Sequence, residues 1–167
     1  MNLRMVQRIL GLMLVIFSLT MLPPIGVSFA FGDGHWQPFL DSFLIVAAVG
    51  LVLWFPVRQV RRDLRLRDGF LVVAVFWICL GVAGATPFLL SDVPELSFTD
   101  AVFEAVSGFT TTGATVITGL DELPKSILYY RQQIQWLGGM GVIVLAVALL
   151  PVLGIGGMSL YKAETPG

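Results

Sequence analysis

Long apolar runs constrain this chain more than any other feature of its sequence. Four of them cover residues 9–31, 39–57, 69–90 and, for the most apolar part of the last, 134–160. A helix of about 20 apolar residues crosses a bilayer, so each run has roughly the length of a spanning helix. Only 13% of the residues are charged, against about 25% in soluble domains. We therefore predict an all-α membrane protein, because a helix satisfies its own backbone hydrogen bonds inside a membrane.

The first run allows two interpretations. Arg4 and Arg8 precede it, and the pair Pro23 and Pro24 interrupts it. Two positive charges before an apolar core also mark secretory signal peptides, for which residues 28–30 would be a weak cleavage site. We favour a retained spanning helix, because the later runs require the N-terminus to lie on the cytoplasmic side.

The short loop between the second and third runs is strongly basic. Its five arginines are Arg58, Arg61, Arg62, Arg65 and Arg67. Short loops rich in Lys and Arg stay in the cytoplasm, which places the N-terminus there as well. A surface that docks lipid or a partner protein is the alternative role for these arginines. We expect no nucleic-acid partner, because the net charge of the chain is −1.

A segment too short to span the membrane follows the third run. Ser97 and Asp100 have the spacing of a capping box, which predicts the start of a helix. From Asp100 to Gly108 this helix would measure only about 13 Å at ~1.5 Å per residue. The chain then has to return to the outer side, as a re-entrant segment does. Irregular backbone at membrane depth is tolerated where it is buried in protein or lines water.

The turn after this short helix has the chemistry of an ion-selectivity filter. Thr110, Thr111, Thr112, Gly113 and Ala114 follow one another there. Thr111 and Thr112 offer oxygens to a cation such as potassium, and Gly113 permits a positive φ without a Cβ clash. Ala114 stands where potassium channels have a bulky aromatic residue, so we expect weaker bracing and looser selectivity. An ordinary polar turn is the alternative.

Two further features bear on this candidate site. Glu104 lies within the short helix, where we interpret it as an acceptor for backbone N–H groups of the filter loop rather than as an ion ligand. The last helix is predicted to begin at Pro124. Near its end, Gly154, Gly156 and Gly157 form a candidate hinge, for which close helix packing is the alternative.

The sequence lacks the residue patterns of an enzyme. Cys79 and His35 are each the only residue of their type, in an apolar run and in a loop. They form neither a catalytic set nor a cluster with the spacing of metal ligands. We therefore predict neither an enzyme nor a bound cofactor, and we treat potassium as a transported ion.

Three stretches of the chain resemble the TrkH/TrkG-type potassium uptake subunits of the Trk/Ktr/HKT superfamily. They are residues 107–114, 130–141 and 157–167. The resemblance covers the whole chain and implies two N-terminal spanning helices with the basic loop (1–68), followed by one helix–pore loop–helix repeat of a potassium-channel-like fold (69–167). It further implies potassium uptake or symport across the bacterial inner membrane. Within the filter segment Thr110 to Ala114, it implies that Thr111, Thr112 and Gly113 line the ion path.

The same resemblance implies partners besides the lipid bilayer. In this family four such repeats in one chain surround a single pore, and each contributes one filter segment. The subunit assembles as a homodimer and couples to a cytosolic nucleotide-binding ring that controls gating. The chain has a single filter segment, so we interpret it as the N-terminal portion of such a subunit. A truncated, non-conducting membrane fragment or scaffold subunit is the alternative.

Overall fold

The computed structural model describes residues 3–60 and 66–149, and every regular element in those ranges is helical. Three segments are long and apolar enough to cross a membrane, namely Leu3–Phe31, Gln37–Val57 and Leu71–Leu90. The predicted all-α membrane fold is confirmed. In chain order, with η for a 3-10 turn, the elements are α1 (Leu3–Ser18), η1 (Leu19–Met21), α2 (Leu22–Phe31), α3 (Gln37–Trp54), η2 (Phe55–Val57), α4 (Leu66–Leu90), α5 (Phe98–Phe109), η3 (Leu120–Glu122) and α6 (Lys125–Leu149).

Two of the sequence predictions fall on residues outside the described ranges. One is the candidate hinge at Gly154, Gly156 and Gly157. The other concerns the basic loop, of which positions 61–65 are outside the description. The fourth apolar run, predicted over 134–160, is described as far as Leu149.

The first apolar run forms one rod, made of α1, η1 and α2 in succession. Pro23 and Pro24 lie in the first turn of α2, where the missing N–H of a proline has no intrahelical acceptor to lose. The backbone tightens into the 3-10 turn η1 immediately before them. The proline pair does not break the span of 29 residues. It is accompanied only by the short 3-10 turn η1 within an otherwise α-helical rod.

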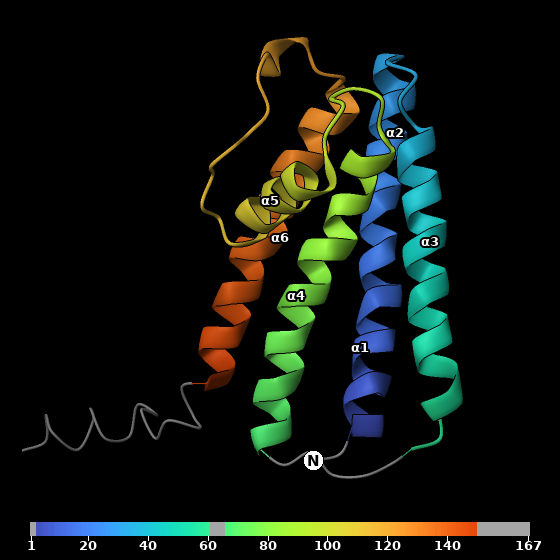
Figure 1. The fold of residues 1–167 in the computed structure, drawn as a ribbon, viewed down its shortest axis with the longest axis vertical. Helices are drawn as coiled ribbons and strands as arrows, with labels where there is room; N and C mark the ends of the chain where they lie inside the picture. The colour runs from blue at the N-terminus through green and yellow to red at the C-terminus, as the bar shows by residue number, and fades with distance from the viewer. Residues whose placement is uncertain (1–2, 61–65, 150–167) are drawn as a thin grey trace, which may run out of the picture.

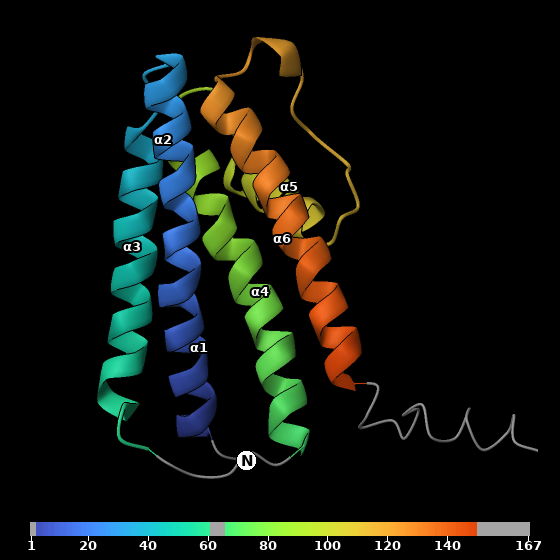
Figure 2. The same ribbon diagram turned by 180° about the vertical axis from the view of Figure 1, so that it is seen from behind.

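The long helices run roughly side by side, and α5 is a short wedge among them. The α1–α2 rod lies antiparallel to α3, and α4 and α6 stand on its other side (Figures 1 and 2). Helix α5 contacts both α4 and α6. The chain enters α5 from the end of the bundle where α2 ends, and the loop after α5 climbs back to that same end (Figure 1). This path has the form of the predicted re-entrant segment.

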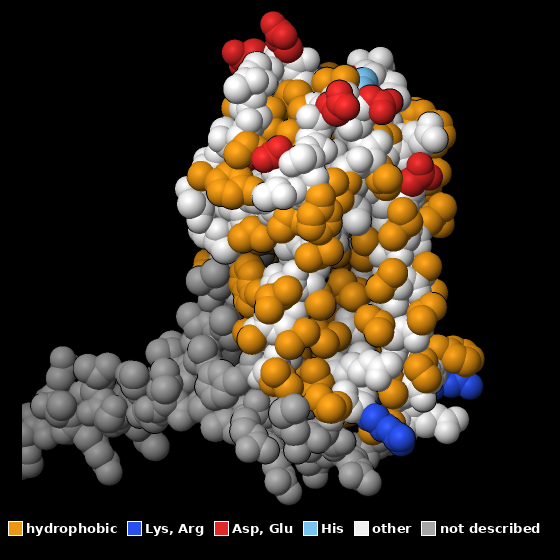
Figure 3. All heavy atoms as spheres, in the orientation of Figure 1, with side chains coloured by type: hydrophobic (Ala, Val, Ile, Leu, Met, Phe, Trp, Pro, Cys, Tyr) orange, Lys and Arg blue, Asp and Glu red, His pale blue; other side chains and the backbone are white. Residues whose placement is uncertain are grey.

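Charged side chains are sorted between the two ends of the bundle. On the face drawn in Figure 3, the acidic side chains lie toward the end where α2 finishes, and the Lys and Arg side chains lie at the opposite end. Exposed apolar side chains cover the surface between them. This distribution suits a helical bundle with an apolar belt in a bilayer and a polar region at each surface.

Tyr130 on α6 lies at the centre of the core. Its ring is fully buried and contacts Phe39 on α3 and Phe88 on α4, with ring centroids 5.5 and 5.3 Å away. Its hydroxyl donates a hydrogen bond of 2.9 Å to the carbonyl oxygen of Gly84 on α4. A buried tyrosine needs such a partner for its hydroxyl group. This side chain therefore fixes α6 against α3 and α4.

Asp33, in the loop between α2 and α3, ties the same end of the bundle to the start of α6. Its Oδ2 accepts a 2.8 Å hydrogen bond from the backbone N–H of Ser126, and its Oδ1 accepts from the backbone N–H of His35 at 3.0 Å and from the Ser28 hydroxyl. Burial by itself raises the pKa of the carboxyl, but the hydrogen bonds from Ser28, Ser126 and His35 outweigh it and lower the pKa from 3.8 to about 2.

The stabilisation supplied by ionised Asp33 should disappear only in strong acid. Because the pKa in the folded protein lies below the ordinary 3.8, the contribution is complete above about pH 4 and is lost as the pH falls toward 2. We expect the difference in melting temperature between the detergent-solubilised protein and its Asp33→Ala variant to stay constant from about pH 7 to about pH 5. A difference that shrinks within that range would show that the carboxyl is not held by these donors.

Candidate functional site

Helix α5 begins at the predicted cap residue Ser97, and the Asp100 carboxylate accepts a hydrogen bond from the Ser97 hydroxyl, so the N-cap half of the predicted capping box is present. Ser97 Oγ accepts a 3.2 Å hydrogen bond from the backbone N–H of Asp100, and the Ser97 hydroxyl donates to Asp100 Oδ2 at 2.7 Å. The helix that follows has 12 residues, or about 18 Å at ~1.5 Å per residue. It is slightly longer than predicted, because Phe98 and Phe109 are part of it, but it remains too short to cross a bilayer.

The end of α5 is a compact hydrogen-bonded turn formed by the threonines. The backbone N–H of Thr111 donates to the carbonyl of Gly108 at 2.9 Å, and that of Thr112 donates to Ser107 at 3.0 Å. This is the Schellman arrangement, which requires a left-handed residue just after the helix. Thr111 occupies that position with φ of 57°, the one positive φ among non-glycine residues of the described ranges. A β-branched residue there is strained by about 1–3 kcal/mol.

The next residues continue the irregular backbone and leave their carbonyl groups free. Gly113 has φ of 74°, in the region that its missing Cβ allows. Thr110 to Ala114 are all exposed in this structure. Within the described ranges, the carbonyl oxygens of Thr111, Thr112 and Gly113 accept no hydrogen bond. Three consecutive peptide oxygens are thus available to a ligand from outside this chain.

The threonine hydroxyls are occupied by local hydrogen bonds. Thr110 Oγ1 donates to the carbonyl of Val106 at 2.8 Å and lies 2.8 Å from Thr112 Oγ1. The Thr111 hydroxyl donates to the carbonyl of Thr110 at 2.7 Å. These contacts hold the side chains against the helix end, so the free oxygens of the turn are mainly those of the backbone.

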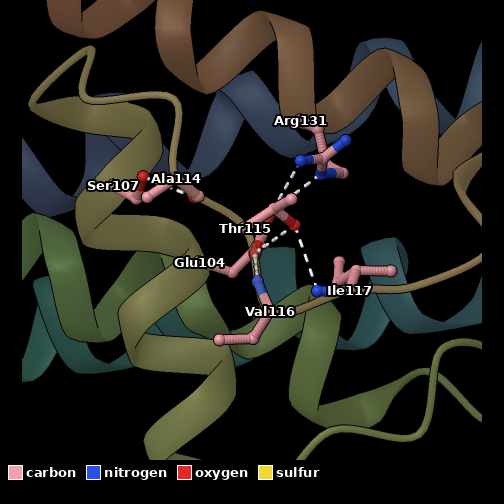
Figure 4. A network of polar contacts seen from close by, with 7 residues as sticks. All are labelled: Glu104, Ser107, Ala114, Thr115, Val116, Ile117 and Arg131. Carbon is pink, nitrogen blue, oxygen red and sulfur yellow. Dashed lines mark hydrogen bonds and ion pairs between the residues drawn. The ribbon is translucent and has the colours of Figure 1, made fainter.

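Glu104 and Arg131 hold the far side of the loop (Figure 4). The Glu104 side chain is only 3% exposed, and its Oε1 lies 2.7 Å from Arg131 Nη2 and 2.8 Å from Arg131 Nε. The same carboxylate accepts from the Thr115 hydroxyl at 3.0 and 2.9 Å and from the backbone N–H of Val116 at 3.2 Å. Thr115 Oγ1 in turn accepts from the N–H of Ile117 at 3.1 Å.

A second contact, between Ser107 and Ala114, joins the loop to helix α5. The Ser107 hydroxyl donates a 2.6 Å hydrogen bond to the carbonyl of Ala114 (Figure 4). The loop is therefore held at Ala114 by α5 and at Thr115 and Val116 by the Glu104–Arg131 pair. These contacts fix the chain directly after the turn, and the hydrogen bonds at the end of α5 fix it directly before, so the backbone from Thr111 to Gly113 is held at both ends.

The C-terminal end of α5 lies in close contact with α6. A Cβ atom added at Gly138 would lie 2.0 Å from the carbonyl oxygen of Phe109, and no side chain fits in that space. On the other side, the Phe109 ring lies against Gly84 of α4. Gly138 therefore allows the end of α5 to approach the backbone of α6 closely.

The structure thus gathers the predicted residues on one turn and adds one that the sequence analysis missed. Thr110 to Ala114 form the turn itself, and Glu104 lies behind it with its carboxylate directed at Thr115 and Arg131. Arg131 is 7% exposed and belongs to the same network. The signal for it was an arginine on the predicted last helix, because a cation packed among helices calls for an acidic partner. In the described ranges, no group of three or more His, Cys, Asp or Glu residues is placed so that it could hold a metal ion.

Comparison with known proteins places these features in a family. The family model described as "TrkH: Cation transport protein" matches residues 35–167. Trk system potassium uptake protein TrkH of Halomonas elongata is 59% identical over 167 residues, and TrkH of Escherichia coli (strain K12) is 52% identical over 167 residues. Both alignments cover 100% of this chain and 35% of the relative.

A solved structure is also similar. The crystal structure of the potassium transporter TrkH from Vibrio parahaemolyticus matches with a TM-score of 0.88 and 57% identity, over 95% of this chain and 34% of that chain. This chain therefore spans about a third of the length of the relatives that it matches. The family predicted from the sequence is confirmed: the chain belongs to the TrkH family of cation transport proteins.

Proposed function

We propose that this chain supplies one of four selectivity-filter segments of a potassium uptake subunit in the bacterial inner membrane. In this proposal residues 1–68 form an N-terminal helix pair with the basic loop in the cytoplasm, and residues 69–167 form the first pore repeat. Potassium passes the turn from Thr110 to Ala114, where the carbonyl groups of Thr111, Thr112 and Gly113 take the place of part of its water shell. Transport is passive or coupled to a second ion.

The observation that carries the proposal is the set of three free carbonyl oxygens on an anchored loop. These carbonyl groups are exposed in this chain, and at membrane depth an exposed backbone carbonyl needs either protein or a water-lined path with a ligand to satisfy it. Hard cations such as potassium are bound by such neutral oxygens. The strained φ of Thr111 agrees with a functional role, because strained backbone persists where its surroundings enforce it.

The same loop requires further protein around it. Irregular backbone at membrane depth has to be buried in protein or to line water. Next to the turn, a groove of about 400 Å³ is lined by apolar and threonine side chains, among them Phe103, Val106, Thr110 and Thr112. We assign this face to the other three repeats of the subunit, with the ion between them. The homodimer and the cytosolic nucleotide-binding subunit extend the proposal by family resemblance.

Substitution of the filter glycine tests the proposal. In a chimaera of Escherichia coli TrkH that carries this chain in place of its matching segment, Gly113→Ser should change the potassium-to-sodium flux ratio by about tenfold. The reason is that a side chain is strained at φ of 74° and displaces the neighbouring carbonyl groups. The measurement is ion flux in vesicles with the amount of protein quantified.

Gly119→Ser is the matched control for this experiment. Gly119 also has a positive φ, of 67°, but lies in the outer loop, and a Cβ there meets only Glu122 Oε2 at 3.9 Å. This variant carries the same strain without touching the turn and should keep the flux ratio. An unchanged ratio in Gly113→Ser at normal expression would refute the filter assignment.

Expression of this chain by itself separates the proposal from its alternative. In a strain deficient in potassium uptake, the chain alone should not restore growth at low potassium, whereas the chimaera should. Growth with the chain alone would show that copies of it assemble into a pore. Failure of both would favour a non-conducting scaffold.

A further inference from the structure

We propose that Asp33 is a positioning residue for the filter loop, acting through the N-terminus of α6. The inference rests on the proposed function, since it concerns the same loop. It also gives the N-terminal helix pair a role beyond anchoring. Asp33 precedes residues 35–167, the range that the family model matches.

The first step is the cap of α6. The first intrahelical hydrogen bond runs from the N–H of Leu128 to the carbonyl of Pro124. The N–H of Ser126 therefore has no acceptor within its own helix. Asp33 Oδ2 supplies that acceptor at 2.8 Å, across 93 residues of sequence. A carboxylate at a helix N-terminus also interacts favourably with the helix dipole.

The carboxylate that makes this contact is itself held in place. The Ser28 hydroxyl and the backbone N–H of His35 both donate to Asp33 Oδ1. The carbonyl of Asp33 lies 2.7 Å from His35 Nδ1. Asp33 is thus a rigid part of the α2–α3 loop, and its position defines where α6 begins.

A second contact joins the same two parts of the chain further along α6. Gln133 Nε2 donates a 2.7 Å hydrogen bond to the carbonyl of Thr20 in η1. Gln133 lies seven residues after Ser126, which is about two helical turns and therefore the same side of α6. The two contacts together fix both the height and the rotation of α6 against the α1–α2 rod.

The last step leads from α6 to the filter. Arg131 lies between Ser126 and Gln133 on α6, and it holds the carboxylate of Glu104. Glu104 in turn holds Thr115 and Val116, directly after the filter turn. A shift at the start of α6 therefore moves Arg131 and loosens one of the two anchors of the loop. This is a continuous series of contacts from the outer loop to the free carbonyl groups.

The test uses the chimaera. It compares the potassium-to-sodium flux ratio with two other quantities, the amount of protein in the membrane and the maximal rate of transport. Asp33→Ala removes the cap and should lower the potassium-to-sodium flux ratio, and raise the KM for potassium, by about three- to tenfold. Asp33→Asn keeps one side-chain oxygen and should give a smaller change in the same direction. If Asp33 only supported folding, its replacement would lower the maximal rate in proportion to the amount of protein and would leave the flux ratio unchanged.

Two controls isolate the cap. Ser126→Ala keeps the backbone N–H that donates to Asp33 Oδ2, so its flux ratio should be unchanged. Asp92→Ala removes an exposed acid from the loop between α4 and α5 and measures the effect of charge alone. If Asp92→Ala changes the ratio as much as Asp33→Ala does, the cap has no role and the inference is wrong.

The remaining outcomes separate the inference from the proposed function. If Gly113→Ser changes the flux ratio and neither Asp33 variant does, the filter assignment stands and the inference is overturned. If Gly113→Ser has no effect either, the proposed function itself fails. Should Asp33→Ala not reach the membrane, Asp33→Asn decides by the same ratio, and no change in it overturns the inference.

Discussion

Arg131→Met should destabilise the protein by about 3–5 kcal/mol, because it leaves the carboxylate of Glu104 buried without its cation. The side chains of this pair are 9% and 3% exposed, so water does not replace the lost partner. The same change frees Thr115 and Val116 from a fixed position and should abolish selective potassium uptake in the chimaera. Thermal unfolding in detergent and ion flux in vesicles measure the two effects.

The double variant Glu104→Gln with Arg131→Met provides the critical comparison. Replacing both charges removes the penalty of an unpaired buried ion, so it should recover much of the stability lost in Arg131→Met. Lys125→Met is the matched control, because Lys125 is an exposed cation on the same helix and makes no ion pair within the described ranges. If Arg131→Met and Lys125→Met melt at the same temperature, the buried pair has no structural importance.

Gly138→Ala should prevent the turn after α5 from docking on α6. The added Cβ would lie 2.0 Å from the carbonyl oxygen of Phe109 and 2.6 Å from its carbonyl carbon. Both are backbone atoms, so the contact is relieved only by moving the end of α5. Overpacking that shifts backbone typically costs about 1–3 kcal/mol, and an added Cβ this close to a carbonyl oxygen belongs at the upper end of that range. We expect little folded protein in the membrane and no measurable potassium uptake.

Gly139→Ala is the control for this prediction. It makes the same substitution at the next residue, where the added Cβ meets only Thr111 Cγ2 at 3.8 Å, an ordinary contact. Both variants gain equally in helix propensity, so a difference between them measures the close approach alone. Normal expression and uptake by Gly138→Ala would mean that α5 does not rest against α6 as described.

Much of the architecture could be predicted from local sequence signals. The length of the apolar runs predicts four spans, because hydrocarbon thickness sets the length of a spanning helix. Three of them are found as spans in the described residues, and the fourth run, over 134–160, is described only as far as Leu149. Ser97 and Asp100 predict where α5 begins, because a capping box involves only neighbouring residues. Gly113 is likewise found at positive φ, as its residue type allows. The pair Pro23 and Pro24 interrupts the first apolar run in the sequence, yet the rod continues, because both prolines lie in the first turn of α2, where no intrahelical hydrogen bond is lost.

The contacts of the candidate site depended on the tertiary structure. Glu104 was visible as an acid in a re-entrant helix, but its pairing with Arg131 joins residues 27 positions apart and follows from how α5 wedges against α6. The left-handed Thr111 contradicts the preference of its own residue type and is imposed by the turn around it. The hydrogen bond from Ser126 to Asp33 spans 93 residues. Local sequence thus determined which segments are helices and where the turn from Thr110 to Ala114 lies. Only packing decided which groups pair with Glu104 and Asp33, because their partners lie far from them in the chain.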